Sequence, residues 1–220
     1  MSSSRRILII AALSAGLAFA TGSRAEEGQS LLAAALEAAK GGEIEKAVSL
    51  YDELLSLESI ANDVKVAAYN NRGVIYDDLG LLDAALKDFS AALLLDPSSS
   101  EAYNNRGITF AKSGKMDRAI TDFDRALFLS PDDPEVYSNR AVAYGKLGHL
   151  EAALRDFNRA LRLRKDDAVT LYNRALLHLE MGNEQKARAD LESASSLSPG
   201  NETIARKFRD LGWDEVSPAP

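Results

Sequence analysis

The sequence lacks cysteine altogether and has few of the other residues on which compact catalytic sites depend. Without cysteine the chain can form no disulfide, no thiolate-ligated metal site and no lipid-modified N-terminal cysteine. Its two histidines, His149 and His178, have no further histidine or carboxylate pair at metal-ligand spacing, so we expect no metal and no cofactor. A Gly-rich phosphate loop and a nucleophile elbow are also missing. We therefore do not expect an enzyme.

The longest apolar run extends from Ile7 to Ala20, and these 14 residues are too few for a membrane-spanning helix, which needs about 20. Arg5-Arg6 precedes the run, and Ser23-Arg24-Ala25 follows it with small residues where a signal peptidase reads. Residues 1–25 are thus predicted to be a cleavable signal peptide, cut after Ala25, which makes the mature chain periplasmic or secreted. A retained membrane anchor and twin-arginine export remain alternatives.

Basic residues are also few relative to acidic ones. Beyond residue 25 the chain carries 23 basic and 33 acidic side chains, a net charge of −10. The longest basic run is Arg162-Leu163-Arg164-Lys165. Such a surface repels phosphate backbones and anionic lipids. We expect no nucleic-acid partner and no stable membrane insertion after signal cleavage.

What the sequence has instead is a period of 34 residues, which divides it into the repeats 66–99, 100–133, 134–167 and 168–201. A fixed period of this size indicates a solenoid of helical hairpins, each of which buries its core against its neighbours. Identical or similar residues recur in columns: Asn71, Asn105, Asn139, Asn173; Arg72, Arg106, Arg140, Arg174; Gly80, Gly114, Gly148, Gly182; Ala85, Ala119, Ala153, Ala187; Asp88, Asp122, Asp156, Asp190; Phe89, Phe123, Phe157, Leu191.

The spacing within a repeat predicts two helices and their inner faces. Tyr103, Gly107 and Phe110 lie at i, i+4 and i+7, which is one side of a helix. The glycine column after this helix suits a terminus that needs a positive φ. At the junctions, Asp133 and Asp167 are placed to cap the helices that follow them.

The flanks extend the pattern at both ends. Residues 26–65 are predicted to form a degenerate first hairpin with four extra residues, about one helical turn, before the next repeat. Residues 202–212 are predicted to form a capping helix with a polar outer side, as solenoids need. The last segment, 213–220, is expected to be a disordered tail, although Trp213 is expected to pack on the capping helix.

These columns resemble the tetratricopeptide repeat (TPR) family over residues 28–212. The motif Tyr-x-Asn-Arg-Gly followed by Asp-Phe-x-x-Ala-Leu is similar to that of exported bacterial TPR proteins. The resemblance implies an all-α fold: a right-handed α-solenoid of about five helix-turn-helix repeats plus a C-terminal capping helix. It also implies a non-catalytic scaffold that binds a protein or peptide partner, with a role in cell-envelope assembly as one expectation.

The arginine column predicts structural ion pairs. Each arginine has an aspartate sixteen residues later, on the second helix of the same hairpin, and a pairing that recurs four times indicates a device that fixes hairpin geometry. The predicted pairs are Arg72–Asp88, Arg106–Asp122, Arg140–Asp156 and Arg174–Asp190. The alternative is a row of arginines that binds a ligand.

The asparagine column is the candidate peptide-binding groove. An amide both donates and accepts, so a row of amides can hold an extended peptide backbone, and a similar asparagine ladder lines the TPR domain of O-GlcNAc transferase. The alternative is that these amides bond neighbouring helices and stabilise stacking. The candidate groove residues are Asn70, Asn71, Val74, Asn104, Asn105, Ile108, Asn139, Val142, Asn173 and Leu176.

The resemblance leaves two hypotheses about function, and a third possibility can be set aside first. The segment 136–141 resembles co-chaperone TPR domains that clamp a C-terminal carboxylate, but Val169 and Asn173 stand where that clamp needs basic residues. A carboxylate clamp is therefore not expected. The first reading is a periplasmic adaptor that binds an extended segment of a partner. The second is a structural or oligomeric subunit that docks folded partners through its edges or its convex face.

Overall fold

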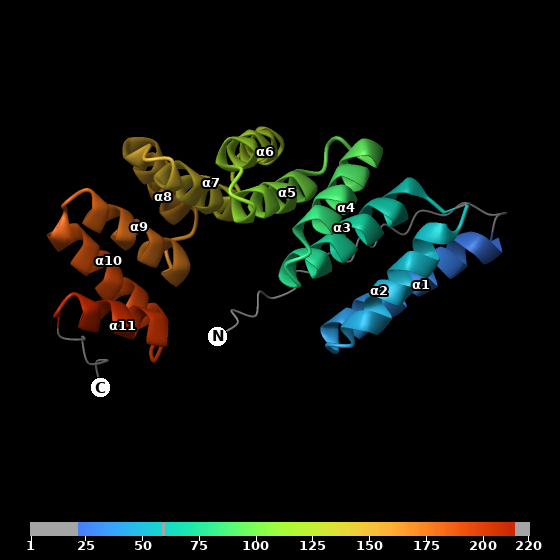
Figure 1. The fold of residues 1–220 in the computed structure, drawn as a ribbon, viewed down its shortest axis with the longest axis horizontal. Helices are drawn as coiled ribbons and strands as arrows, with labels where there is room; N and C mark the ends of the chain where they lie inside the picture. Colours follow the sequence, from blue (N-terminus) through green and yellow to red (C-terminus); the bar gives the residue numbers. More distant parts are fainter. Residues whose placement is uncertain (1–21, 59, 214–220) are drawn as a thin grey trace. The chain divides into compact units, whose positions relative to one another are not determined.

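The computed structural model describes residues 22–58 and 60–213, and all the regular structure in this part of the chain is helical (Figure 1). The sequence therefore predicted the fold class correctly. The eleven helices are α1 (Gly22–Lys40), α2 (Ile44–Ser56), α3 (Asn62–Asp78), α4 (Leu82–Leu95), α5 (Ser100–Lys112), α6 (Met116–Leu129), α7 (Pro134–Lys146), α8 (Leu150–Leu163), α9 (Ala168–Glu180), α10 (Glu184–Leu197) and α11 (Glu202–Asp210).

The chain divides between Ser113 and Gly114 into two compact units, and within each unit the helices pack in chain order. In the first unit α1 packs on α2 and α3 packs on α4, while α3 also contacts α5. In the second unit α7 packs on α8, α9 packs on α10, and α7 contacts α9. The predicted repeat 100–133 thus contributes its first helix to one unit and its second helix to the other.

Turns and caps follow the local chemistry that the sequence indicated. Gly80, Gly148 and Gly182 end first helices at φ of 76°, 76° and 74°, a conformation that costs glycine little and other residues more. The Asp133 carboxylate accepts hydrogen bonds from the backbone N–H groups of Glu135 and Val136. Asp167 caps α9 in the same way. Each cap satisfies amides that a helix start would otherwise leave without partners.

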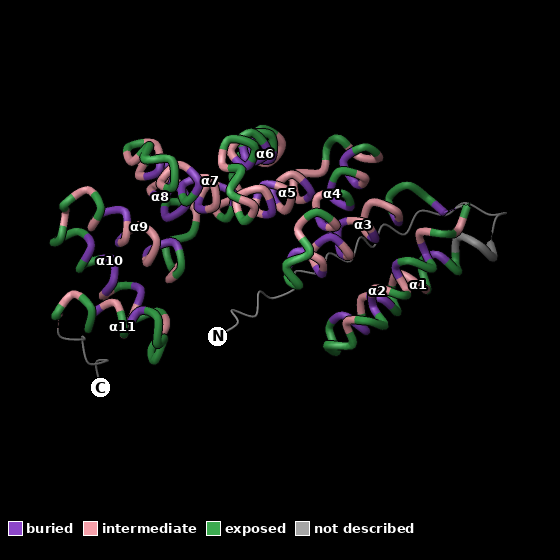
Figure 2. The backbone as a smooth tube through the Cα atoms, in the orientation of Figure 1, coloured by how far each residue is buried: buried purple, intermediate pink, exposed green. Residues whose placement is uncertain are grey.

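The core consists of small and large residues that alternate between paired helices. Ala153, Phe157 and Ala160 of α8 are buried, and Ala141 of α7 packs with the first two. In the α3–α4 hairpin a Cβ added to Gly73 would lie 2.8 Å from the ring of Phe89, so only glycine permits this approach. Figure 2 shows exposed residues at the interhelical turns and buried residues along the helices. The residues that fix the hairpins are thus the columns of the repeat.

The two ends of the chain differ from the regular hairpins. Helix α3 has 17 residues whereas α5 has 13, so the four extra residues form one more turn at the start of α3. The predicted signal peptide lies mostly outside the described residues, and α1 already begins at Gly22. At the other end, Ile204 and Phe208 bury one side of α11, and the Trp213 ring contacts Phe208 edge-on. Trp213 therefore belongs to the cap, and 214–220 lies outside the described residues.

Candidate functional site

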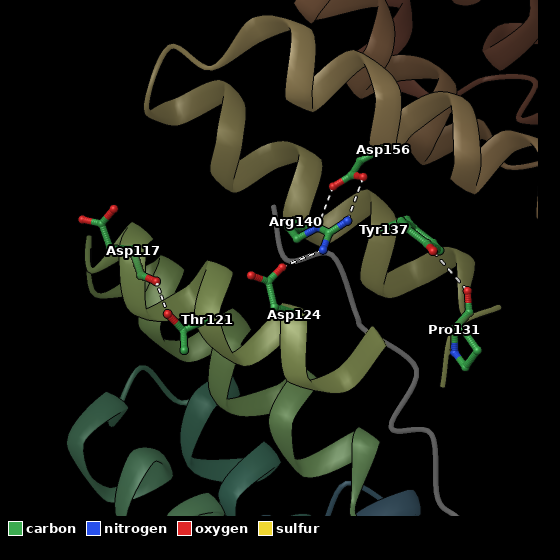
Figure 3. Close-up of polar contacts among 7 residues, drawn as sticks. All are labelled: Asp117, Thr121, Asp124, Pro131, Tyr137, Arg140 and Asp156. Carbon is green, nitrogen blue, oxygen red and sulfur yellow. Dashed lines mark hydrogen bonds and ion pairs between the residues drawn. The ribbon is translucent and has the colours of Figure 1, made fainter. Parts of the chain in front are cut away.

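Three of the four arginines of the column connect three helices rather than two. Arg140 of α7 donates from Nε and Nη2 to the carboxylate of Asp156 on α8, at 2.7 and 2.9 Å (Figure 3). Its Nη1 donates to Asp124 on α6, at 2.6 Å. Asp156 is almost fully buried, whereas Asp124 is more than half exposed. The guanidinium therefore joins its own hairpin to the preceding one.

The same arrangement recurs in two other hairpins. Arg72 donates two hydrogen bonds to Asp88 and a third to Asp52 on α2. Hydrogen bonds from this guanidinium to Asp88 raise the Arg72 pKa further above its usual value. Arg174 donates two to Asp190, at 2.8 and 2.7 Å, and a third to the Asn158 side chain on α8, at 2.7 Å.

Arg106 is the member whose predicted partner lies in the other unit. Arg106 belongs to the first unit, where its Nη1 donates to the Ser90 hydroxyl on α4 at 3.2 Å, whereas Asp122 belongs to the second unit. Three of the four predicted pairs lie within one unit and are bonded there, whereas the fourth would join the two units. Each arginine also has a further contact that the sequence analysis missed. The missed signal is a polar residue sixteen positions before the arginine: Ser90, Asp124 and Asn158.

Aromatic rings enclose three of these guanidinium groups. Arg140 lies 5.5 Å from the ring centre of Tyr137 and 5.8 Å from that of Tyr144. Arg72 and Arg106 each lie within 6 Å of two ring centres in the same way. Cation–π contacts at this range are favourable and restrict the side chain. The geometry assigns these arginines to the framework of the hairpins.

The asparagine column behaves differently along the chain. In the first unit, the Asn105 amide donates to Asn70 at 3.1 Å, and the Asn70 amide donates to Glu101 at 2.9 Å. These contacts join α5 to α3. The expected row of free amides is therefore not present at Asn105, whose amide serves the stacking role that we kept as the alternative. Asn70, Asn71 and Asn104 are buried.

A second polar cluster joins the same two helices further along. The Thr109 hydroxyl of α5 donates to Asp77 of α3 at 3.0 Å, and the Lys112 ammonium group forms an ion pair with the same carboxylate. Asp77 and Thr109 are buried. The inner side of α3 and α5 is thus closed by its own side chains. Among the groove candidates of this unit, Val74 and Ile108 are only partly exposed.

Replacement of Glu101 by glutamine is expected to stabilise the first unit at neutral pH. Burial raises the pKa of Glu101, and the hydrogen bond from Asn70 offsets this only in part. A carboxyl group with a raised pKa in the folded state favours folding most when it is protonated, and this advantage disappears as the pH rises through the folded pKa. Urea unfolding at pH 7 should show a higher midpoint for Glu101→Gln than for wild type.

The matched control is Glu135→Gln, because Glu135 holds the equivalent place in α7, 34 residues later, and is exposed. Its midpoint should not change beyond error. Below the unfolded pKa of a glutamate, about 4.3, the advantage of Glu101→Gln should vanish. Equal effects of the two substitutions at pH 7 would show that burial of Glu101 is not the cause.

The inner side of α7 and α9 is more open, and we call it the α7–α9 face. Its residues are spaced three or four apart on each helix, which places them on one side; they are Asn139, Val142, Val169, Tyr172, Asn173 and Leu176. The two helices are joined below them by the hydrogen bond from Thr170 to Ser138, both buried. Val142 is 37% exposed and Val169 is 68% exposed. This face presents aliphatic groups beside amides.

In the described part of the chain, two buried side-chain polar atoms have no hydrogen-bond partner: the Tyr51 hydroxyl and Nδ1 of His178. Burial lowers the pKa of His178, so its imidazole is neutral near pH 7. Among residues 22–58 and 60–213, no group of three or more acidic or histidine side chains is arranged to hold a metal ion. None of the helices in this range has the length and apolar character needed to cross a bilayer.

Comparison with known families decides what these repeats are. Family models of the tetratricopeptide repeat match residues 32–93, 76–134, 110–171 and 168–201. The chain belongs to the tetratricopeptide repeat family. Among curated proteins, none matches the sequence closely enough to count as a relative. TPR repeats provide surfaces for protein–protein interaction, so the coarse functional class is a protein-binding repeat domain.

Solved structures of TPR proteins share this fold. YrrB, "a TPR protein with an unusual peptide-binding site", is 22% identical with a TM-score of 0.63, over 81% of this chain and 90% of that one. MamA from Desulfovibrio magneticus is 18% identical with a TM-score of 0.70, over 83% of this chain and 99% of that one. The APC/C hetero-tetramer Cut9–Hcn1 is 23% identical with a TM-score of 0.73, over 83% of this chain but 36% of that one.

Proposed function

We propose that this protein is a non-catalytic periplasmic TPR adaptor that binds an extended segment of a partner protein on its α7–α9 face. The observation that carries the proposal is the exposure of Val142 and Val169 beside the asparagines of the column. An extended segment presents alternate side chains and a row of peptide groups. Apolar side chains of the segment would contact the valines, and its peptide groups would bond to the amide of Asn173.

The contrast between the two units supports this choice. On the inner side of α3 and α5, Asn70, Asn105 and Glu101 bond to one another, and Asp77 binds Lys112. A partner would have to break these contacts before it could use the same groups. On the α7–α9 face, burial of Val142 and Val169 would remove apolar surface from water, and these side chains hold no polar contact that a partner would have to break. The second unit therefore offers the better site.

The periplasmic part of the proposal rests on residues 1–25 of the sequence, with their basic start, short apolar run and Ser23-Arg24-Ala25 site. Sequencing the N-terminus of the protein after expression and export from its native cell tests this. A mature chain that begins at Glu26 supports the proposal, and an intact N-terminus in the membrane fraction contradicts it.

Replacement of Val142 and Val169 by lysine is expected to weaken partner binding about tenfold or more. Each lysine removes aliphatic contact and places a charge where the partner must exclude water, which costs well over 1 kcal/mol. The partner would first be identified by a photo-crosslinking residue at Val169 in the exported protein. Affinity of the purified pair would then be measured by calorimetry, with melting curves to establish that the variants fold.

The control substitution is Phe128→Lys, which places the same charge on α6 in the same unit. Phe128 is 75% exposed, so the change does not disturb a core. It should alter affinity less than twofold. A partner that tolerates both valine substitutions and is lost with Phe128→Lys would contradict the proposal.

That reversed outcome would favour the second candidate function, a subunit that docks folded partners or its own copies through second helices. One observation favours it. Leu94 on α4 is 83% exposed, and Phe128 stands at the equivalent place one repeat later. Large exposed apolar residues at a repeated position are a feature of interaction surfaces. Sedimentation of wild type and Phe128→Lys would show whether self-association depends on this residue.

A further inference from the structure

A hollow of about 300 Å³ opens between α8, α9 and α10 of the second unit. Its walls are Leu154 and Asn158 of α8, Arg174 and His178 of α9, and Lys186, Ala189 and Asp190 of α10, where the Asp190 carboxylate is held by Arg174. The hollow adjoins the arginine cluster of the last hairpin, and none of these residues belongs to the α7–α9 face. Because the chain is repetitive, the same place in other hairpins serves as an internal reference.

The first departure from that reference is the loss of both tyrosine or phenylalanine rings beside the arginine, one replaced by leucine and the other by the smaller imidazole of a histidine. Arg140 is enclosed by Tyr137 and Tyr144. At the equivalent positions around Arg174 stand Leu171 and His178, so no tyrosine or phenylalanine of the column covers this guanidinium. The planar contact that restricts the other arginines is missing where the hollow has formed.

The second departure is a change of charge. Arg140 binds two carboxylates, Asp156 and Asp124, and Arg72 likewise binds two. Arg174 binds one carboxylate, Asp190, and the neutral amide of Asn158. In addition, Lys186 replaces the alanines found at this position in the α3–α4 and α7–α8 hairpins, Ala84 and Ala152. Arg155 stands in the α7–α8 hairpin at the position of Ala189 and acts on Tyr144, so it belongs to the reference cluster. The local charge therefore changes from 0 at Arg140 (Arg140, Arg155, Asp124 and Asp156) to +1 at Arg174 (Arg174, Lys186 and Asp190).

The third departure is His178 itself. Its side chain is buried, and its Nδ1 has no hydrogen-bond partner. A buried polar atom without a partner costs free energy, and such atoms are rare in native structures. The equivalent positions in the other hairpins, Tyr76, Phe110 and Tyr144, carry rings without a ring nitrogen. An incompletely satisfied imidazole thus lies in the wall of the hollow.

We infer that this hollow binds a small aromatic carboxylate. The ring of the ligand takes the place of the missing tyrosine beside Arg174 and His178, and its carboxylate supplies the missing negative charge near Lys186. Both requirements follow from what the last cluster lacks relative to the cluster at Arg140. Planar stacking on a guanidinium and a charge-assisted hydrogen bond to an ammonium group are each favourable. The cavity volume is at the lower end for small-molecule sites.

The experiment uses benzoate as the probe and the two histidines as reporters. In the full mature chain at pH 7 and constant ionic strength, nitrogen-15 NMR resolves the imidazoles of His178 and His149. Benzoate is expected to shift the His178 signals in a saturable way, with a dissociation constant of the order of millimolar for so small a ligand. His149, which is exposed outside the hollow, should not respond.

The variant Lys186→Ala adopts the residue of two other hairpins, so it should fold, and it should weaken benzoate binding about tenfold. Lys165→Ala removes the same charge at an exposed place outside the hollow and should leave the affinity within twofold. Benzamide, with the ring but no charge, and acetate, with the charge but no ring, should each bind much more weakly than benzoate. Val169→Lys, on the α7–α9 face, should not change benzoate binding.

Three results would overturn the inference. The His178 signals could stay unmoved at tens of millimolar benzoate. Benzamide or acetate could shift them as strongly as benzoate does. Lys165→Ala could weaken binding as much as Lys186→Ala does, which would reveal general attraction of an anion. The test does not depend on the proposed partner, because the ligand is a small molecule and the hollow lies apart from the valines.

Discussion

Replacement of Arg140 by alanine is expected to lower the free energy of unfolding by about 3–5 kcal/mol. The change leaves the nearly buried Asp156 carboxylate without the two hydrogen bonds that now neutralise it. Removal of one partner from a buried ion pair has a cost of this size, because the remaining charge stays out of water. It also removes the contact to Asp124 on the preceding helix. Urea unfolding at pH 7 measures the effect.

A double-mutant cycle shows whether the pair is the cause. Asp156→Ala alone should also destabilise, but the double variant should be much less destabilised than the sum, because both changes disrupt one interaction. Arg164→Ala is the control: this arginine is 54% exposed and lies 3.6 Å from Asp167, so its loss should cost less than about 1 kcal/mol. Strict additivity, with partner binding lost only in Arg140→Ala, would place Arg140 in a binding row.

The hairpins could be predicted because the period of the sequence acts as its own alignment. Ala153 and Phe157 each belong to a column whose residues make the same packing contacts in every repeat. A residue type that recurs in such a column four times is not a chance similarity. Helix caps such as Asp133 could also be predicted, because the capping side chain bonds to backbone N–H groups only two or three residues later. The division of the chain between α5 and α6 could not be read, because the columns continue across it without interruption.

For the arginine clusters, the sequence predicted the partner within the hairpin but not the partner in the preceding hairpin. The partner within the hairpin lies at a constant distance of sixteen residues and is always aspartate, so repetition makes it visible. The partner in the preceding hairpin varies between Ser90, Asp124 and Asn158. For Arg72 the four-residue excess shifts it to Asp52, twenty positions away. A contact made by different residue types at a changing distance leaves little pattern to detect.

The asparagine column shows the limit of reasoning from a column alone. Asn105 and Asn173 hold equivalent places, yet Asn105 bonds to Asn70 on the preceding first helix, whereas Ser138 stands at the position that corresponds to Asn70 for Asn173. The neighbour across the helix contact decides whether an amide serves stacking or stays accessible to a partner. That neighbour lies in a different repeat, and the period does not show which residue types face each other across the two helices. Binding by this column stays a prediction.

Tyr51 is the other place where one repeat departs from the rest at a cost. Its ring fills the position held by Phe89, Phe123 and Phe157 in later hairpins, and it is wholly buried among Ala47, Leu54 and their neighbours. Unlike phenylalanine it adds a hydroxyl group, which has no hydrogen-bond partner. Burial accordingly raises the pKa of Tyr51, since ionisation there would be more costly still.

Replacement of Tyr51 by phenylalanine is therefore expected to increase the free energy of unfolding by about 1–3 kcal/mol, the cost of a buried hydroxyl group without a partner. The two rings have the same shape, so packing should be preserved. The reverse change in the next hairpin, Phe89→Tyr, is the matched control and should destabilise by a similar amount, because its ring is also buried. Urea unfolding of both variants at pH 7 provides the comparison. A Tyr51→Phe variant less stable than wild type would show that the hydroxyl group has a partner in solution, such as a bound water, and that the first hairpin retains tyrosine for stability.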